Sequence, residues 1–273
     1  MTIPNFVLNS GHSIPALGLG TYKMPPQITA GMVEQALRLG YRHIDTASLY
    51  ANEAEVGQGL RRSEVPREEV FVTTKLWNDA HRRDDALRAF DTSLARLGLD
   101  YVDLYLIHWP APAGGLMVQA WQALIEIANS GRALSIGVSN FRAEDLAAVI
   151  DATGLTPAVN QIELHPLFQQ RDLRALHAEL DITTEAWSPL GRGADLGEPT
   201  VRAVAREVGR SPAQVVIRWL LQLDVVVFPK TARPERLAEN LAVDDFELDP
   251  GQMERLGAIK GTGRVGSDPG EVA

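Results

Sequence analysis

The sequence has no cysteine, no long apolar run and no excess of positive charge, and each absence excludes a class of protein. Without cysteine among its 273 residues, the chain has no disulfide, thiolate metal site or cysteine nucleophile, so redox chemistry requires a bound cofactor. No apolar run approaches the roughly 20 residues that span a bilayer, and Met1 to Ser10 lacks a basic start and an apolar core. The net charge of −9 repels phosphate backbones. We therefore expect a cytoplasmic protein without membrane or nucleic-acid partners, and a monomer by default.

Seven apolar segments each run into a polar or aromatic residue. A short strand ends at Asp45, and the others are Val70 to Thr74 before Lys75, Val102 to Ile107 before His108, Leu134 to Val138 before Ser139-Asn140, Ala158-Val159 before Asn160-Gln161, Ile182 to Ala186 before Trp187, and Val225 to Phe228 before Lys230. The intervals run from 22 residues (Ser139 to Gln161) to 43 residues (Trp187 to Lys230), close to one strand-plus-helix unit each.

Segments with helical spacing alternate with these strands. Arg83 to Leu97 precedes Gly98, Met117 to Ala128 precedes Gly131, and Ser211-Pro212 is an N-cap followed by a first-turn proline. Alternation predicts a parallel sheet. With a first strand at 17–20, the pattern predicts an α/β fold, a (β/α)8 TIM barrel formed by a single domain over residues 1–273, with its site at the strand C-termini.

Two additions to the barrel are expected. Phe6 to Ile14, with a turn at Asn9 to Gly11, predicts an N-terminal β-hairpin that plugs the bottom of the barrel. Arg233 to Leu241 and Asp249 to Ile259 predict two extra C-terminal helices, where barrels often bind phosphate.

Asp45, Tyr50, Lys75 and His108 are predicted to share the barrel mouth. A phenol has a reference pKa of about 10 and is a poor acid at neutral pH unless a cation stabilises the phenolate, which Lys75 can do. A buried lysine needs an anion, and Asp45 is the nearest candidate. The three would form a proton relay, with His108 as a second donor to a developing oxyanion.

Each of these residues also has an ordinary structural interpretation. Asp45 alone would be a loop cap, Lys75 and Tyr50 solvated or core residues, and His108 a buried, hydrogen-bonded histidine. Their coincidence at the ends of three successive strands favours a catalytic site.

The segment Phe228 to Asn240 combines cations, a hydroxyl and the start of a helix. Lys230, Thr231 and Arg236 there suit a terminal phosphate, although a solvated basic turn explains the charges equally well. The three G-x-G triplets lack the third glycine of a dinucleotide fingerprint; they are Gly18-Leu19-Gly20, Gly191-Arg192-Gly193 and Gly261-Thr262-Gly263. His165 has no second histidine at a ligand-like spacing, so no metal is expected.

Aromatic residues directly after strands predict an apolar pocket. Tyr22, Trp77, Trp109 and Trp187 are in such positions, whereas Trp121 and Trp219 lie on helical stripes and are predicted to pack. Tyr22, Trp77 and Trp109 are expected to contact the substrate, with the glycine-rich tail from Gly261 to Ala273 as a mobile lid.

The motifs together resemble those of the aldo-keto reductases over nearly the full chain. They are Gly40 to Ala47 with Tyr50, Asn52-Glu53 and Val56-Gly57; Thr73 to Trp77; Leu106 to Pro110; Gly137 to Phe141; Asn160 to Glu163; Trp187 to Gly191; and Lys230-Thr231 with Arg236 and Asn240. Within the family the chain is most similar to bacterial 2,5-diketo-D-gluconate reductases, including the tail Gly263-Arg264-Val265.

The resemblance implies a barrel that binds NADPH, with Asp45, Tyr50, Lys75 and His108 as the catalytic tetrad. It implies Ser139, Asn140 and Gln161 on the nicotinamide amide, Trp187 stacked on the nicotinamide ring, and Lys230, Thr231 and Arg236 on the 2'-phosphate. The same motifs add Ser188, Leu190, Gly191 and Asn240 to the cofactor site. Thr231 stands where serine is commoner and Phe228 where a smaller aliphatic is usual; neither removes a donor. The loop Ala111 to Gly115 is short, so family specificity does not transfer.

The expected function is NADPH-dependent reduction of aldehydes and ketones, with Tyr50 as general acid. Small carbonyls, α-dicarbonyls and keto-sugar acids such as 2,5-diketo-D-gluconate are the expected substrates. The alternative is an NADPH-binding sensor or regulatory barrel, which would have little need for an intact tetrad. A metal-dependent hydrolase would need clustered histidine and carboxylate ligands, and only Asp45 and His108 are available.

Overall fold

The computed structural model describes residues 3–261 and 263–272. Met1, Thr2, Thr262 and Ala273 lie outside the described residues, and the last two belong to the predicted lid.

Eight parallel strands, hydrogen-bonded in chain order, form the central sheet. They are β3 (Leu19–Gly20), β4 (His43–Asp45), β5 (Phe71–Leu76), β6 (Val102–Ile107), β7 (Ala133–Ser139), β8 (Val159–Glu163), β9 (Thr183–Trp187) and β10 (Val226–Val227). Parallel bridges from Leu17 to Val227 and from Gly20 to Lys230 join the first strand to the last. The sheet therefore closes on itself, as the predicted barrel requires.

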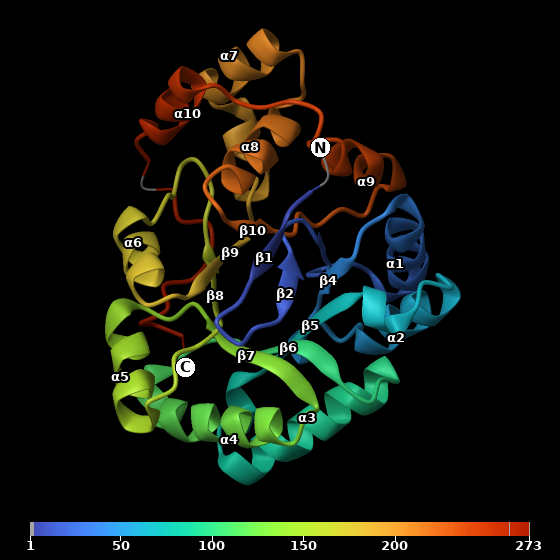
Figure 1. Ribbon diagram of the computed structural model, residues 1–273, viewed down its shortest axis with the longest axis vertical. Coiled ribbons are helices and arrows are strands. Elements are labelled where there is room, and N and C mark those ends of the chain that lie inside the picture. The colour runs from blue at the N-terminus through green and yellow to red at the C-terminus, as the bar shows by residue number, and fades with distance from the viewer. Residues whose placement is uncertain (1–2, 262, 273) are drawn as a thin grey trace.

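The helices surround this sheet, as Figure 1 shows. They are α1 (Pro26–Leu39), α2 (Glu53–Arg62), α3 (Arg83–Leu97), α4 (Met117–Asn129), α5 (Ala143–Thr153), α6 (Arg171–Glu179), α7 (Pro199–Val208), α8 (Pro212–Leu221), α9 (Pro234–Leu241) and α10 (Pro250–Gly257). Local sequence explains several boundaries. Gly98 ends α3 in the left-handed conformation, and Ser211 opens α8 in a capping box with Gln214. The two C-terminal helices predicted from sequence are α9 and α10. The described residues contain no helix with the length and apolar character needed to cross a membrane.

The N-terminal hairpin covers one end of the barrel (Figure 1). β1 (Asn5–Val7) pairs antiparallel with β2 (Ser13–Pro15). In the turn, Asn9 Nδ2 donates to the carbonyls of Pro157 at 3.2 Å and Asp181 at 3.0 Å, just before β8 and β9 begin. The hairpin thus plugs the end at which strands start, as predicted, and leaves the opposite end for a site.

The predicted ends of several strands were wrong. β7 ends at Ser139 and β9 at Trp187, each one residue later than predicted, and β10 ends at Val227, one residue earlier. Lys75 lies inside β5 rather than after it, and Asn160 and Gln161 lie inside β8. A strand buried on both faces normally excludes such side chains, which is why the sequence pattern placed them beyond the apolar run. The structure accepts them because each makes hydrogen bonds to other buried groups.

Candidate active site

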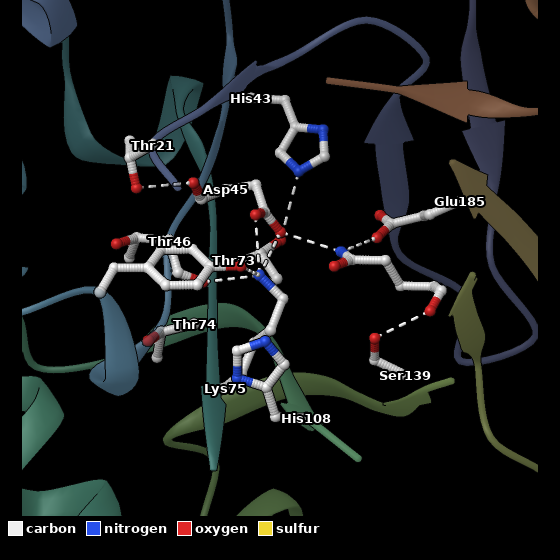
Figure 2. A network of polar contacts seen from close by, with 12 residues as sticks. Thr21, His43, Asp45, Thr46, Thr73, Thr74, Lys75, His108, Ser139 and Glu185 are labelled. Carbon is white, nitrogen blue, oxygen red and sulfur yellow. Dashed lines mark hydrogen bonds and ion pairs between the residues drawn. The ribbon is translucent and has the colours of Figure 1, made fainter. Parts of the chain in front are cut away.

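Lys75 and Asp45 form a buried ion pair at the C-terminal end of the barrel. Lys75 Nζ lies 2.7 Å from Asp45 Oδ1 and 2.8 Å from Oδ2, and it also donates to the Thr46 carbonyl at 2.8 Å. Their side chains are 0% and 2% exposed. Burial raises the pKa of Asp45, and the hydrogen bonds from Lys75 and Gln161 oppose that rise. The predicted pairing of these two residues is confirmed, and Figure 2 shows it at the centre of a polar network.

Tyr50 brings a phenol to this pair from the loop after β4. It ends a short 3₁₀ turn (Ser48–Tyr50), which the Ser48 hydroxyl ties to the Lys75 carbonyl at 2.9 Å. The Tyr50 hydroxyl lies 3.5 Å from Lys75 Nζ. Burial and the Asp45 carboxylate raise the pKa of Tyr50 well above its usual value. The phenol is therefore protonated at neutral pH and holds a proton that it can donate.

His108 faces Tyr50 across the site. The ring centroids are 5.6 Å apart, and the His108 ring also meets the Trp77 ring edge-on at 5.2 Å. Burial and the Lys75 cation lower the pKa of His108 well below its usual range. The imidazole is therefore neutral and can offer an N–H to a polar ligand atom without adding a charge.

Glu185 is a buried acid of this network that the sequence reasoning missed. It lies on β9, fully buried, where its Oε2 accepts from Gln161 Nε2 at 2.7 Å; the same nitrogen donates to Asp45 Oδ2 at 2.9 Å. Burial and Asp45 raise the pKa of Glu185 to about 8. The sequence did contain a signal for Glu185, because an acid in the middle of a strand that is buried on both faces needs a polar partner.

A cavity of about 300 Å³ opens above the network. Most of the predicted site residues line it: Tyr22, Asp45, Tyr50, Trp77, His108, Trp109, Ser139, Asn140, Gln161, Trp187, Ser188 and Lys230. Gly20, Leu49, Pro189, Arg192, Phe228, Gly266, Ser267 and Val272 complete the lining. Aromatic walls around a few polar groups are typical of a small-molecule site.

One wall of the cavity combines a flat ring with polar edges. Trp187 donates from Nε1 to Asn140 Oδ1 at 2.7 Å, and Asn140 Nδ2 donates to Ser139 Oγ at 3.0 Å. Gln161 uses Nε2 for Asp45 and Glu185, which leaves its Oε1 to accept from a ligand. An aromatic ring that carries a carboxamide fits such a wall.

Five predicted cofactor residues lie outside the lining of this cavity. Leu190 and Gly191 follow β9, and Thr231, Arg236 and Asn240 lie in and before α9. The Thr231 hydroxyl accepts from Arg233 N at 3.0 Å, and Arg236 is exposed in the first turns of the helix. Lys230, which lines the cavity, connects the two regions, so an extended ligand could reach both.

His165 contacts acids rather than further histidines. Its ring nitrogens lie 3.2 Å from Glu163 Oε1 and 2.9 Å from Asp195 Oδ2, and all three side chains are fully buried. Within residues 3–261 and 263–272, no group of histidine, aspartate and glutamate has the arrangement of a metal site.

A family model described as "Aldo/keto reductase family" matches residues 16–260. The chain belongs to the aldo/keto reductase family. Among curated relatives, this aldo-keto reductase is 50% identical to an aldo-keto reductase of Mycolicibacterium smegmatis over 97% of each chain. It is 46% identical to methylglyoxal reductase DkgA of Escherichia coli, over 96% of this chain and 95% of the relative.

Solved structures agree with the barrel. A variant of Gox0644 in complex with NADPH superposes with a TM-score of 0.96 at 47% identity, with all of both chains covered. The family resemblance and the barrel with its N-terminal hairpin, both predicted from the sequence, are therefore confirmed.

Proposed function

We propose that this aldo-keto reductase reduces small aldehydes and ketones, including α-dicarbonyls, with NADPH as hydride donor and Tyr50 as proton donor. The observation that carries the proposal is the position of Lys75, whose ammonium lies between the Asp45 carboxylate and the Tyr50 hydroxyl, two groups that line the cavity. Membership of a reductase family and the NADPH complex of a relative that is 47% identical support the enzyme class and the cofactor.

The residues of the cavity fit the nicotinamide end of such a cofactor. The half-buried Trp187 ring offers a surface for stacking, while Ser139, Asn140 and the free Oε1 of Gln161 offer partners for a carboxamide. Lys230, Thr231 and Arg236 at the start of α9 would hold a terminal phosphate. When bound, NADPH supplies the hydride.

The tetrad handles the proton. His108, neutral because it is buried, would donate an N–H to the carbonyl oxygen and polarise it. Hydride addition turns that oxygen into an alkoxide, a stronger base than phenolate, which takes the proton from Tyr50. The Lys75 ammonium then stabilises the Tyr50 phenolate, and Asp45 holds that ammonium in place. The product is the alcohol, and solvent returns a proton to Tyr50.

Consumption of NADPH with methylglyoxal, benzaldehyde and glyceraldehyde tests the activity. Tyr50→Phe keeps the ring but removes the proton, so we expect turnover to fall by about 10² to 10⁴-fold while NADPH still quenches tryptophan fluorescence. A Tyr50→Phe variant with near wild-type turnover would assign the proton to another group. NADPH binding without any turnover in the wild type would favour the sensor instead.

A further inference from the structure

One buried carboxylate binds the backbone of the C-terminal tail, residues 263–272, at the barrel mouth. Gly263 N also donates to the Leu167 carbonyl at 3.3 Å, and the Arg264 guanidinium lies over the Phe168 ring. Glu163, the last residue of β8, accepts from Val265 N at Oε1 (2.5 Å) and from Gly266 N at Oε2 (2.9 Å). The Glu163 side chain is 0% exposed. Both oxygens of one acid therefore bind the tail backbone, more than 100 residues further along the chain.

Glu163 is itself fixed and ionised by the cluster behind it. The His165 ring bridges Glu163 and Asp195, and Asp195 Oδ1 also accepts from Leu167 N at 3.3 Å. Burial would raise the pKa of Glu163, but the hydrogen bonds from His165 and the two tail amides outweigh it and hold that pKa below its usual value. The two acids raise the pKa of His165 to about 9 against the effect of burial. At neutral pH the tail is thus held by a carboxylate that is paired with an imidazolium.

The anchored part of the tail packs closely against the Trp187 ring at Gly266. A Cβ atom on Gly266 would lie 2.3 Å from Cη2 of the Trp187 ring and 2.8 Å from Glu163 Oε2, so only glycine fits there. Trp187 is tied on its other side through Nε1 to Asn140. Gly266, Ser267 and Val272 line the same cavity as Tyr50 and His108.

We propose that Glu163 is a positioning residue that sets which carbonyl compounds the reductase accepts, by fixing the tail against Trp187 as one wall of the substrate pocket. Glu163 does not line the cavity, so it acts through the tail rather than on the substrate. The inference rests on the proposed function, because it takes the occupant of the cavity to be the carbonyl substrate.

Glu163→Gln is the direct test, because glutamine keeps the shape but turns one acceptor oxygen into a donor that faces a tail N–H. We expect hydrogen–deuterium exchange in the peptide covering residues 263–272 to accelerate about tenfold or more. With saturating NADPH, KM for methylglyoxal, benzaldehyde and glyceraldehyde should rise by unequal factors of roughly 2 to 12, the range for loss of one hydrogen bond, while kcat stays within about threefold. Glu68→Gln, at an exposed acid before β5, is the matched control and should change neither quantity.

A double-mutant cycle separates action through the tail from general damage. Gly266→Ala displaces the same tail segment from Trp187 by its added methyl group, in a full-length chain. If Glu163 acts through the tail, the double variant should show no larger KM than the more affected single variant. If the two substitutions acted independently, the factors by which they raise KM would multiply in the double variant.

The outcomes are distinct. Unchanged exchange in Glu163→Gln overturns the anchor, and multiplied KM effects or an unchanged order of preference among the three substrates overturn the specificity role. A wild-type protein that reduces none of the three compounds overturns the proposed function and the specificity role with it, whereas the exchange measurement still decides the anchor.

Discussion

Replacement of Lys75 by methionine should destabilise the whole barrel, because it leaves the Asp45 carboxylate buried without its cation. Lys75 donates to both oxygens of the Asp45 carboxylate and to the Thr46 carbonyl, and the two side chains are only 0% and 2% exposed. Methionine matches the length of the lysine stem and cannot replace any of these bonds. The loss is therefore electrostatic rather than a loss of packing.

The expected size follows from this burial. Removal of one partner from a buried ion pair costs about 3–5 kcal/mol, because the remaining charge is desolvated and uncompensated. Replacement of both partners by neutral groups costs much less. The double variant Asp45→Asn/Lys75→Met should therefore be more stable than Lys75→Met by at least about 1.5 kcal/mol, although two side chains are replaced in it rather than one.

Reversible urea unfolding at pH 7 measures these free energies of unfolding. Lys260→Met, at an exposed lysine after α10, is the control and should stay within about 0.5 kcal/mol of the wild type. A loss below about 1 kcal/mol for Lys75→Met, or a double variant no more stable than that single variant, would refute the argument that an uncompensated Asp45 charge dominates the loss.

Three further predictions concern charge. Arg236→Ala should weaken NADPH binding by roughly 10 to 150-fold and leave NADH binding nearly unaffected, because a charge-assisted hydrogen bond to the 2'-phosphate contributes about 1.5–3 kcal/mol. Fluorescence titration measures the affinity for both cofactors. An equal loss of affinity for NADPH and NADH would contradict a contact between Arg236 and the 2'-phosphate. The folded-state pKa of Glu185 is raised to about 8, so ionisation of this buried acid lowers the free energy of unfolding as pH rises from about 4.5 to 8. The variant Glu185→Leu removes that penalty. In urea unfolding, its free energy of unfolding should exceed that of the wild type by on the order of 3 kcal/mol more at pH 8 than at pH 5. A gain independent of pH would mean that Glu185 titrates normally. The folded-state pKa of His165 is raised to about 9, so its contribution to the free energy of unfolding is complete below about pH 6.5 and is lost as pH rises to 9. The variant His165→Gln should therefore lose on the order of 2 kcal/mol more of that free energy at pH 6 than at pH 9. An equal loss at both pH values would contradict the ion pairs with Glu163 and Asp195.

The sequence by itself determined the barrel and most of the site. Alternating strands and helices of regular length leave a parallel, closed sheet as the simplest arrangement, and the C-terminal ends of its strands then share one mouth. Asp45, Tyr50, Lys75 and His108 could be placed together on that ground alone. In the structure Asp45, Tyr50 and His108 line one cavity, and Lys75 lies behind them in contact with Asp45 and Tyr50. Local signals were sufficient to predict these strands and helices, because helix capping and helical periodicity depend only on residues close together in the chain.

Tertiary structure decided how the buried polar groups are paired. Glu185 and Glu163 look alike in sequence, since each is an acid in a buried strand. In the structure, however, Glu185 is an acid beside Asp45 with a raised pKa, whereas Glu163 is a carboxylate with a lowered pKa that binds the tail. Their difference comes from partners far away in the chain, such as Asp45 for the first and Val265 and Gly266 for the second. Strand pattern records whether a side chain is buried but not what it meets there, and in a low-dielectric interior those partners determine both charge and role.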